Sequence, residues 1–276
     1  MAADPVIVTP SSIEVDRVDL EPGGVAAIVH LNRPEQLNPI DWDAIRRLEE
    51  VLLGLDADAS VRTVLITGRG RAFSAGGDLK SYVALQADPV GFPAFLEDLH
   101  RTFQFISKMR APVVALVNGV TAAGGLELIL SCDFAYAAKS ARISDGHLTF
   151  GQMGGGGVLT LLPRAIGTAR ARELVFSGRW LTAEEAREWT LVNRVVPDGE
   201  LVAAGLEFAT AAAARSPLAM ANAKHVMNTA WSEGTGVDAA LRLERERNAF
   251  YCLTSEDARE GLRAFSEKRP PKFRGR

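Results

Sequence analysis

Short runs of apolar and β-branched residues recur along the chain and predict buried strands. They are Val6–Val8, Val25–Leu31, Val61–Thr67, Pro112–Val117, Phe134–Ala138 and, later, Leu191–Val196. Between them, apolar residues spaced three or four apart predict amphipathic helices from Asp41 to Leu55 and from Phe95 to Ile106. Strands that alternate with helices predict an α/β core with parallel strands, and ligands of such folds bind near the carboxyl ends of the strands.

The second part of the chain has a different pattern. From about Thr168 it becomes helical, and Thr182-Ala183-Glu184-Glu185 is typical of a capping box. After Asp198 four helical stretches follow: Leu201–Ala214, Pro217–Thr229, Val237–Phe250 and Ser255–Phe265. We therefore expect a core over residues 1–198 and a helical region over residues 199–276. The segment Lys80–Phe92, which has few periodic apolar residues, is predicted to be a mobile loop near the site.

Composition excludes several classes of protein. Of the 276 residues, 47% are apolar and 24% are charged, which is enough to bury a substantial core. The net charge of -3 argues against a nucleic-acid partner. No long apolar run predicts a membrane span, the first residues do not resemble a signal peptide, and Cys132 and Cys252 form no metal-binding cluster. These features favour a cytoplasmic protein without a metal.

Two glycine-rich turns are the most informative feature of the sequence. Phe73-Ser74-Ala75-Gly76-Gly77-Asp78 and the stretch from Asn118 to Glu127 each follow an apolar strand and lead into a helix. Such turns leave backbone N–H groups free, and two that face each other could hold an oxygen on which negative charge builds up. Asp78 can cap the helix that follows it. A short glycine motif taken alone is more often an ordinary strand-to-helix turn.

Two titratable side chains are candidates for proton transfer. Glu127 begins an apolar helix, where a carboxylate must be paired, face a pocket or have a raised pKa, although it could also simply favour the helix dipole. His147 has a pKa near neutrality and lies shortly before the glycine run 154–157. Asp145, two residues before His147, could orient it, but we do not expect this pair. His30, His100 and His225 lack nearby polar partners in the sequence and are interpreted as structural or surface residues.

The run Gly154–Gly157 opens another predicted helix, and its free N–H groups could face a substrate. The alternative is a close crossing of two backbones. The run is not a Walker A loop, because no Lys-Ser/Thr follows it, and no acidic residue follows at the spacing of a dinucleotide-binding fingerprint. No cofactor is therefore predicted from this run.

Taken together and in order, these motifs resemble those of the crotonase, or enoyl-CoA hydratase/isomerase, superfamily, from about Val25 to Phe273. The segments that carry the resemblance are Leu31-Asn32-Arg33-Pro34 with Asn38, Arg71 to Leu79, Asn118 to Leu128, Cys132-Asp133, Gly151 to Gly157, Leu181 to Ala186 and Leu191-Val192. The resemblance implies a ββα spiral core with a C-terminal helical trimerisation region. It also implies an acyl-CoA thioester substrate, no cofactor other than that coenzyme A, and a homotrimer or a dimer of trimers.

The resemblance also assigns site residues. It implies that the N–H groups of Gly77 and Gly124 form the oxyanion hole and that Glu127 is catalytic, with His147 at the second catalytic position. The residues that it implies for binding of coenzyme A and substrate are Gln36, Leu37, Ser74, Ala75, Gly76, Asp78, Leu79, Gly155 and Lys268. Lys268 would act near the coenzyme A of its own or a neighbouring subunit.

His147 is where this chain departs from the family's hydratases, which have a second glutamate at that position. Hydration of a 2-enoyl-CoA needs one group to activate water and another to protonate the α-carbon, and Glu127 and His147 could divide these roles. An isomerase needs only one base. A hydrolase or decarboxylase of a β-keto substrate could use His147, although no acid lies between Gly151 and Ile166 to support it. A non-catalytic binding module is the remaining alternative.

Overall fold

The computed structural model describes residues 11–232 and 234–276, so the strand expected at Val6–Val8 lies outside the described residues. Two sheets form the centre of the molecule. The larger has the strand order β1 (Ile13–Asp19), β2 (Val25–Leu31), β3 (Val61–Gly68), β5 (Val113–Val117), β7 (Phe134–Ala138) and β10 (Arg194–Val196). The smaller has the order β4 (Ala72–Ser74), β6 (Val120–Ala122), β8 (Arg142–Ser144) and β9 (Leu181–Thr182).

Most neighbouring strands are parallel, as the sequence predicts. Among the strands of residues 11–232 and 234–276, only β1 in the larger sheet pairs antiparallel with its neighbour, β2, and only β9 in the smaller sheet does so, with β8. Each of β3, β5 and β7 is followed a few residues later by a short strand of the smaller sheet. The carboxyl ends of the long strands therefore lead directly into the turns that the sequence marks as chemically interesting.

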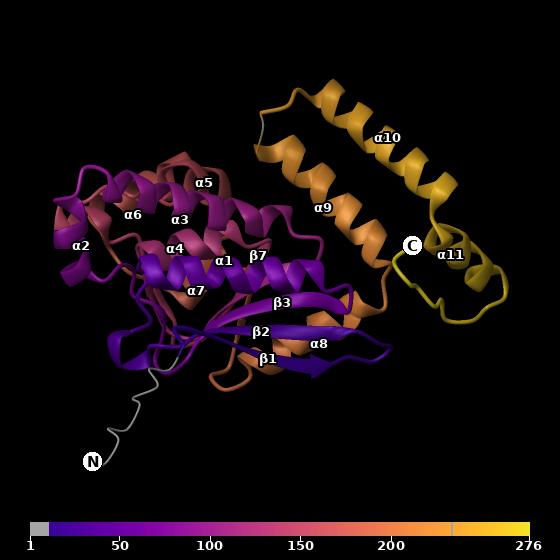
Figure 1. Cartoon of the computed structure of the whole chain (residues 1–276), viewed down its shortest axis with the longest axis horizontal. Helices are drawn as coiled ribbons and strands as arrows, with labels where there is room; N and C mark the ends of the chain where they lie inside the picture. Colours follow the sequence, from indigo (N-terminus) through magenta and orange to yellow (C-terminus); the bar gives the residue numbers. More distant parts are fainter. Residues whose placement is uncertain (1–10, 233) are drawn as a thin grey trace, which may run out of the picture.

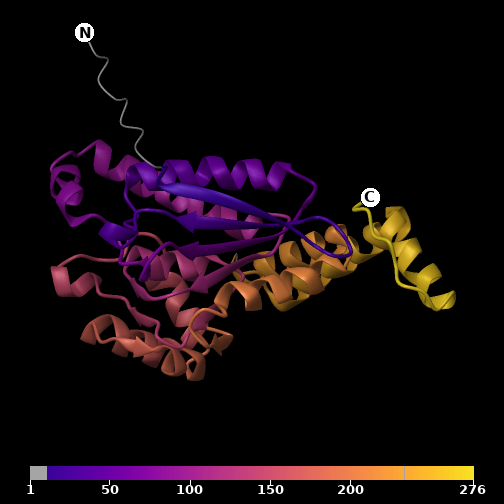
Figure 2. The same ribbon diagram turned by 90° about the horizontal axis from the view of Figure 1, so that it is seen from below.

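Helices cover both faces of the larger sheet (Figures 1 and 2). On one face, α1 (Trp42–Ala57) and α3 (Gly91–Lys108) pack on side chains that include Val64 and Ile66. On the other face, α8 (Leu201–Ala213) packs on Leu65 and its neighbours. Burial of both faces explains why these strands are continuous apolar runs rather than alternating ones.

The remaining helices are α2 (Leu79–Gln86), α4 (Gly124–Ser131), α5 (Val158–Ile166), α6 (Thr168–Ser177) and α7 (Ala183–Glu188), with the 3₁₀ turns η1 (Pro34–Gln36) and η2 (His147–Phe150). The prediction of a mobile loop at Lys80–Phe92 is wrong for most of its length, because α2 occupies it. Asp78 caps this helix by accepting a hydrogen bond from the Lys80 N–H, 3.1 Å away. The capping box at Thr182 and Glu185 is confirmed.

Three C-terminal helices extend away from the sheets: α9 (Pro217–Ser232), α10 (Val237–Thr254) and α11 (Glu256–Ser266) (Figure 1). Lys224 anchors α9 to the core. Its buried ammonium group donates to the carbonyls of Ile106 and Ala111, at 2.9 and 3.2 Å, and lies 2.8 Å from the Asp133 carboxylate. The division at residue 198 stays a prediction, but α8 packs on the sheet and α9 is the first helix to leave it.

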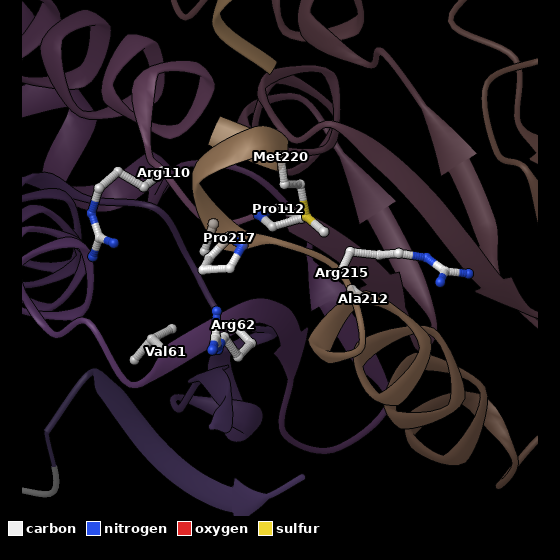
Figure 3. Close-up of a pocket in the computed structure, with 9 residues that line it drawn as sticks. Val61, Arg62, Arg110, Pro112, Ala212, Arg215, Pro217 and Met220 are labelled. Carbon is white, nitrogen blue, oxygen red and sulfur yellow. The ribbon is translucent and has the colours of Figure 1, made fainter. Parts of the chain in front are cut away.

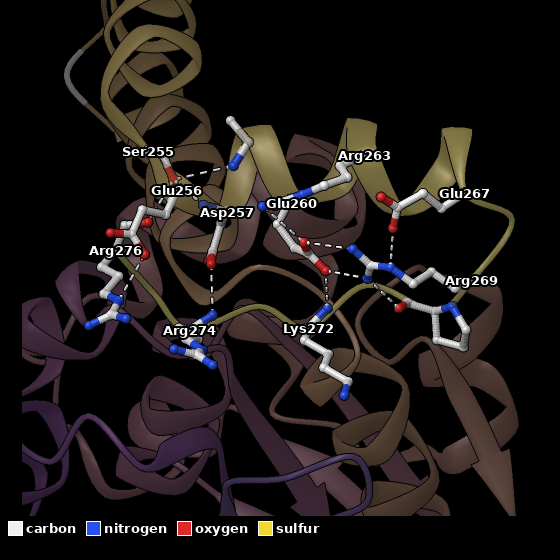
Figure 4. Close-up of polar contacts among 12 residues, drawn as sticks. Ser255, Glu256, Asp257, Glu260, Arg263, Glu267, Arg269, Lys272, Arg274 and Arg276 are labelled. Atoms are coloured by element: carbon white, nitrogen blue, oxygen red, sulfur yellow. Dashed lines mark hydrogen bonds and ion pairs between the residues drawn. The ribbon is translucent and has the colours of Figure 1, made fainter.

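The chain after α11 folds back along that helix (Figure 4). Arg269 forms an ion pair with Glu260 at 2.6 Å, and the Arg276 carbonyl accepts from the Glu256 N–H at 2.7 Å. The buried Asp257 carboxylate accepts from the N–H of Arg274, at 2.7 Å. These contacts fix the end of the chain against the start of α11.

A small cavity lies beside the start of β3, at the end of the strands opposite to the glycine turns (Figure 3). It measures about 10 Å³, which is room for about one water molecule. Arg62 reaches into it, and among the described residues its Nε and Nη1 atoms have no hydrogen-bond partner. The cavity is too small for a substrate.

Candidate active site

The two glycine turns lie against each other at the carboxyl ends of β4 and β6. Ser74 of β4 pairs with Thr121 of β6, which brings the turns that follow into contact. A Cβ atom added to Gly76 would lie 2.8 Å from the Cβ of Ala123 and 3.6 Å from the backbone nitrogen of Gly124. The glycines therefore allow an approach that a side chain would block.

The backbone at the start of α4 is held in an unusual conformation. Ala123 has φ 49° and ψ −118°, a positive φ that costs a non-glycine residue roughly 1–3 kcal/mol. Its N–H donates to the Asp145 carbonyl at 2.9 Å, which helps to hold this conformation. Within the described part of the chain, the N–H groups of Gly77 and Gly124 donate to no acceptor. Both glycines line one cavity, as an oxyanion hole requires.

Glu127 is buried on α4, with only 2% of its side chain exposed. Its Oε1 atom accepts from the N–H of Gly156 at 2.6 Å and from that of Val158 at 3.3 Å. Burial raises the pKa of this carboxyl, and the charge of His147 and the two N–H donors oppose that rise. Glu127 is therefore held at the start of α5 as a base whose strength is tuned by its surroundings.

The glycine run 154–157 has a role that neither interpretation of the sequence described. The N–H of Gly156 in this run, with that of Val158 just after it, binds the Glu127 carboxylate, and the missing side chains of the run leave space for it. A Cβ added to Gly156 would lie 2.6 Å from Glu127 Oε2, and one added to Gly154 would lie 3.5 Å from His147 Cε1. The run positions both candidate side chains.

The Asp145–His147 pair, which the sequence argument rejects, is present. The Nδ1 atom of His147 lies 2.8 Å from Asp145 Oδ1. The expectation is wrong, because side chains two residues apart on a strand share a face. Here both residues lie beyond the end of β8 at Ser144, in a turn at Gly146 that has φ 67°. A carboxylate only accepts hydrogen bonds, so Nδ1 carries the proton of this bond.

The second ring nitrogen of His147 faces the other candidate. Its Nε2 atom lies 4.0 Å from Glu127 Oε2. Burial of the ring works against protonation, but the hydrogen bond to Asp145 and the charges of Glu127 and Asp145 outweigh it, so the pKa of His147 is raised. The surroundings thus favour the protonated form of His147 more than water would, and one water could contact both atoms.

The cavity that contains these groups has a volume of about 260 Å³ and is mostly apolar. Its lining includes Ile40, Leu79, Tyr82, Phe95, Leu96, Leu99, Phe150 and Met153 around Gly77, Gly124, Glu127 and His147. A larger hollow of about 860 Å³, lined by α3 and residues 129–135, contains neither Glu127 nor His147. The smaller cavity is therefore the candidate active site.

Other residues that the sequence assigns to binding lie around this cavity. Ala75, Leu79 and Gly155 line it. Leu37 accepts from the Ala75 N–H at 2.9 Å, which places the segment that includes Gln36 beside the first glycine turn. The Ser74 hydroxyl accepts from the Gly76 N–H at 3.2 Å, and Asp78 caps α2.

Lys268 is the exception among the expected binding residues. It follows α11 and does not line this cavity, which contains residues of α2 at the other end of the molecule (Figure 1). A role for Lys268 in binding would therefore require a neighbouring subunit, and it stays a prediction.

The structure adds two further features, of which the second was not expected from the sequence. Tyr82 lines the cavity from α2, and burial raises the pKa of its phenol. Asp16 lies 2.8 Å from His30 Nε2, so His30 does have a polar partner; β1, which supplies Asp16, was not predicted. The described residues contain no cluster of three or more side chains suited to a metal ion and no helix that could cross a membrane.

Comparison with known proteins gives the same picture along nearly the whole chain. The sequence model of a family described as enoyl-CoA hydratase/isomerase matches residues 21–276. YngF of Bacillus subtilis, assigned to the same group, is 35% identical over 251 residues, 90% of this chain and 94% of YngF. A short-chain-enoyl-CoA hydratase of Clostridium acetobutylicum is 31% identical over 93% of this chain and 97% of its own.

Solved structures agree with these sequence relatives. The crystal structure of an enoyl-CoA hydratase from Bacillus anthracis superposes with a TM-score of 0.88 at 32% identity, covering 96% of this chain and all of its own. An enoyl-CoA hydratase from Polaromonas sp. JS666 superposes with a TM-score of 0.86 at 30% identity, covering 94% of this chain and 99% of its own. The α/β fold with two sheets and C-terminal helices is confirmed.

Proposed function

The chain belongs to the enoyl-CoA hydratase/isomerase family of crotonase-fold enzymes, and we propose that it hydrates a 2-enoyl-CoA thioester. The observation that carries this proposal is the 4.0 Å separation of Glu127 Oε2 and His147 Nε2 inside the cavity that Gly77 and Gly124 line. A base and an acid at this distance can both contact one water molecule.

In the proposed reaction, the thioester oxygen accepts hydrogen bonds from the N–H groups of Gly77 and Gly124. The unprotonated Glu127 carboxylate takes a proton from water as the water oxygen bonds to C3. The C2=C3 electron pair moves toward the carbonyl and forms an enolate, whose oxygen the two N–H groups stabilise. The His147 imidazolium then donates its Nε2 proton to C2. Transfer of the proton from Glu127 to His147 restores the enzyme.

The apolar lining of the cavity supports an apolar acyl group. Six of its side chains, which α2, α3 and the segment 150–153 supply, are Tyr82, Phe95, Leu96, Leu99, Phe150 and Met153. A cavity lined in this way favours hydrocarbon over charged substituents on the acyl group.

One observation favours a second candidate function. Hydrolysis of a β-keto thioester could use His147 as a base if an acid supported it, and the sequence offers none between Gly151 and Ile166. Asp145 supplies such an acid, 2.8 Å from Nδ1. A hydrolase that cleaves the C–C bond and releases an enolate into the same oxyanion hole is therefore the alternative.

The experiment incubates the protein with 2-enoyl-, 3-enoyl- and β-keto-acyl-CoAs in deuterated water and weighs each product by mass spectrometry. We expect a 2-enoyl substrate to gain one water. Exchange of deuterium without added water would indicate an isomerase instead. Cleavage of only the β-keto substrates would favour the hydrolase, and cleavage that survives His147→Ala would count against a hydrolase that uses His147.

We also propose that the C-terminal helices serve self-association, as a trimer or a dimer of trimers. Large apolar side chains on α10 and α11 are exposed, and they are Val237, Leu241, Phe250, Leu253, Leu262 and Phe265. Exposed apolar groups of this number favour a protein contact over solvent. Sedimentation of the protein measures the mass, and a monomer at all concentrations would contradict the proposal.

A further inference from the structure

The turn Asp145-Gly146-His147 connects the candidate acid to the candidate oxyanion hole. The Asp145 side chain contacts His147 Nδ1, and the Asp145 carbonyl accepts from the N–H of Ala123, the residue before Gly124. Gly146 makes this geometry possible through its positive φ of 67°. Asp145 belongs to neither the oxyanion hole nor the water site, but it contacts His147 and the residue that precedes Gly124.

We propose that Asp145 is the positioning residue that fixes the tautomer and the charge of His147, so that Nε2 carries the proton that is transferred. The inference rests on the proposed function, because it assigns to Asp145 the control of the acid in that mechanism. It acts through His147, and it does not itself contact the substrate.

Geometry supports this role. Asp145 is only 1% exposed, and its Oδ2 atom has no hydrogen-bond partner among the described residues. A buried carboxylate with an unpartnered oxygen costs free energy unless a nearby positive charge compensates it. The ring at 2.8 Å is the group placed to do so, and it does so most strongly as an imidazolium.

Other charges near His147 act in the same direction. The titratable groups that face the ring are Asp145 in its own turn and Glu127 from α4. Tyr82, from α2, lines the same cavity, and its phenol is neutral near pH 7. Glu127 binds two backbone N–H donors and lies farther from the ring than Asp145. Asp145 is therefore the partner that sets which nitrogen keeps its proton.

Asp145→Asn tests the inference, because it keeps the shape and the backbone contact to Ala123 and removes only the charge. In the full-length protein without substrate, proton and nitrogen NMR of His147 should show a lower pKa than in the wild type. With substrate, the alkaline limb of the kcat/KM profile should move to lower pH, and kcat at pH 8 should fall by about 10²- to 10⁴-fold. His147→Gln assigns the signal among the chain's 4 histidines.

Two controls separate a positioning role from a structural one. Asp16→Asn removes a carboxylate that lies at the same 2.8 Å from His30, outside the cavity, and should leave turnover unchanged. In a His147→Gln background, Asp145→Asn should cause no further loss of kcat. An equal loss in both backgrounds, or an unchanged titration of His147, would overturn the inference. Because the titration needs no substrate, it tests Asp145 even if no enoyl-CoA is hydrated.

Discussion

Glu127 is an ionisable side chain in a buried position, which lowers the stability of the protein. We therefore expect Glu127→Gln to stabilise the protein while it removes turnover. The carboxylate is 2% exposed, and burial raises its pKa. Both backbone donors, from Gly156 and Val158, bind the same oxygen, Oε1. The carbonyl of a glutamine can accept both of these bonds, so the substitution removes a charge without leaving either donor unpaired.

The magnitude follows from two opposing effects. A raised pKa means that the ionised carboxyl is less favourable in the folded than in the unfolded protein, and one unit of such a shift corresponds to about 1.4 kcal/mol. The attraction to His147 at 4.0 Å and the two N–H bonds stabilise the ion and limit this cost, so we expect a gain of about 1 kcal/mol from the substitution. That corresponds to a rise in Tm of about 2–4 °C. Loss of the base should lower kcat by about 10²- to 10⁴-fold.

The gain in stability of Glu127→Gln over the wild type should increase with pH. The folded-state pKa of Glu127 lies above its unfolded value. The protonated carboxyl therefore contributes stability at low pH, and this contribution is lost as pH rises through the folded pKa. Glutamine does not titrate. The stability of Glu127→Gln should thus exceed that of the wild type most at about pH 8, and this difference in stability should shrink as the pH falls toward about 4.

The assay is urea unfolding at both pH values and at one protein concentration, with initial rates on a 2-enoyl-CoA measured in parallel. Asp257→Asn is the matched control, because both of its oxygens are occupied: Oδ1 accepts from Arg274, and Oδ2 accepts from Ser216 and Gly275 (Figure 4). An amide there must face a donor, so this variant should lose about 1–3 kcal/mol and keep its turnover. A Glu127→Gln protein that is less stable than the wild type at pH 8, or equally active, would refute the reasoning.

Two further substitutions test the supports of the site. Gly156→Ala places a Cβ 2.6 Å from Glu127 Oε2, so kcat in a steady-state assay should fall by about 10²-fold. In the control Gly54→Ala the added Cβ has no atom within 4 Å, and this variant should retain the wild-type kcat. Equal rates for the two variants would contradict the argument. Lys224→Met removes the ammonium group that binds two carbonyls and Asp133. The free energy of unfolding should fall by about 3 kcal/mol, and hydrogen exchange in α9 should increase. Unchanged exchange in α9 would count against an anchoring role for Lys224.

The parts of the fold that could be predicted are those whose pattern is local. Val25–Leu31 was predicted with the bounds of β2, because a strand covered on both faces is a continuous apolar run. β1, Ile13–Asp19, was missed, because its exposed positions carry Asp16, Arg17 and Asp19 and the run is not apolar. The helix α2 was missed for a related reason: none of its residues is buried, so periodicity gave no signal.

The site could be predicted only as far as its backbone turns. Gly77 and Gly124 line one cavity because β4 and β6 pair, and these two short strands were not predicted from the sequence. The partners of Glu127 could not be predicted, because Gly156 and Val158 follow it by 29 and 31 residues and meet it only through the packing of α5. The Asp145–His147 pair could have been expected from its spacing, because side chains two apart on a strand share a face. It forms in the turn at Gly146, just after β8.

This chain has His147 where the hydratases that it resembles have a second glutamate, and this difference changes which group holds the proton that the site donates. Two carboxyl groups at this position would need one of them protonated near neutrality, which only a strongly raised pKa provides. Here the proposed acid is His147, and the pKa of Glu127 and that of His147 are both raised, from ordinary values of 4.5 and 6.5. The proposed mechanism needs Glu127 unprotonated and His147 protonated together. Activity should therefore follow a bell-shaped curve whose two limbs belong to the coupled pair, both displaced to higher pH than isolated side chains would give.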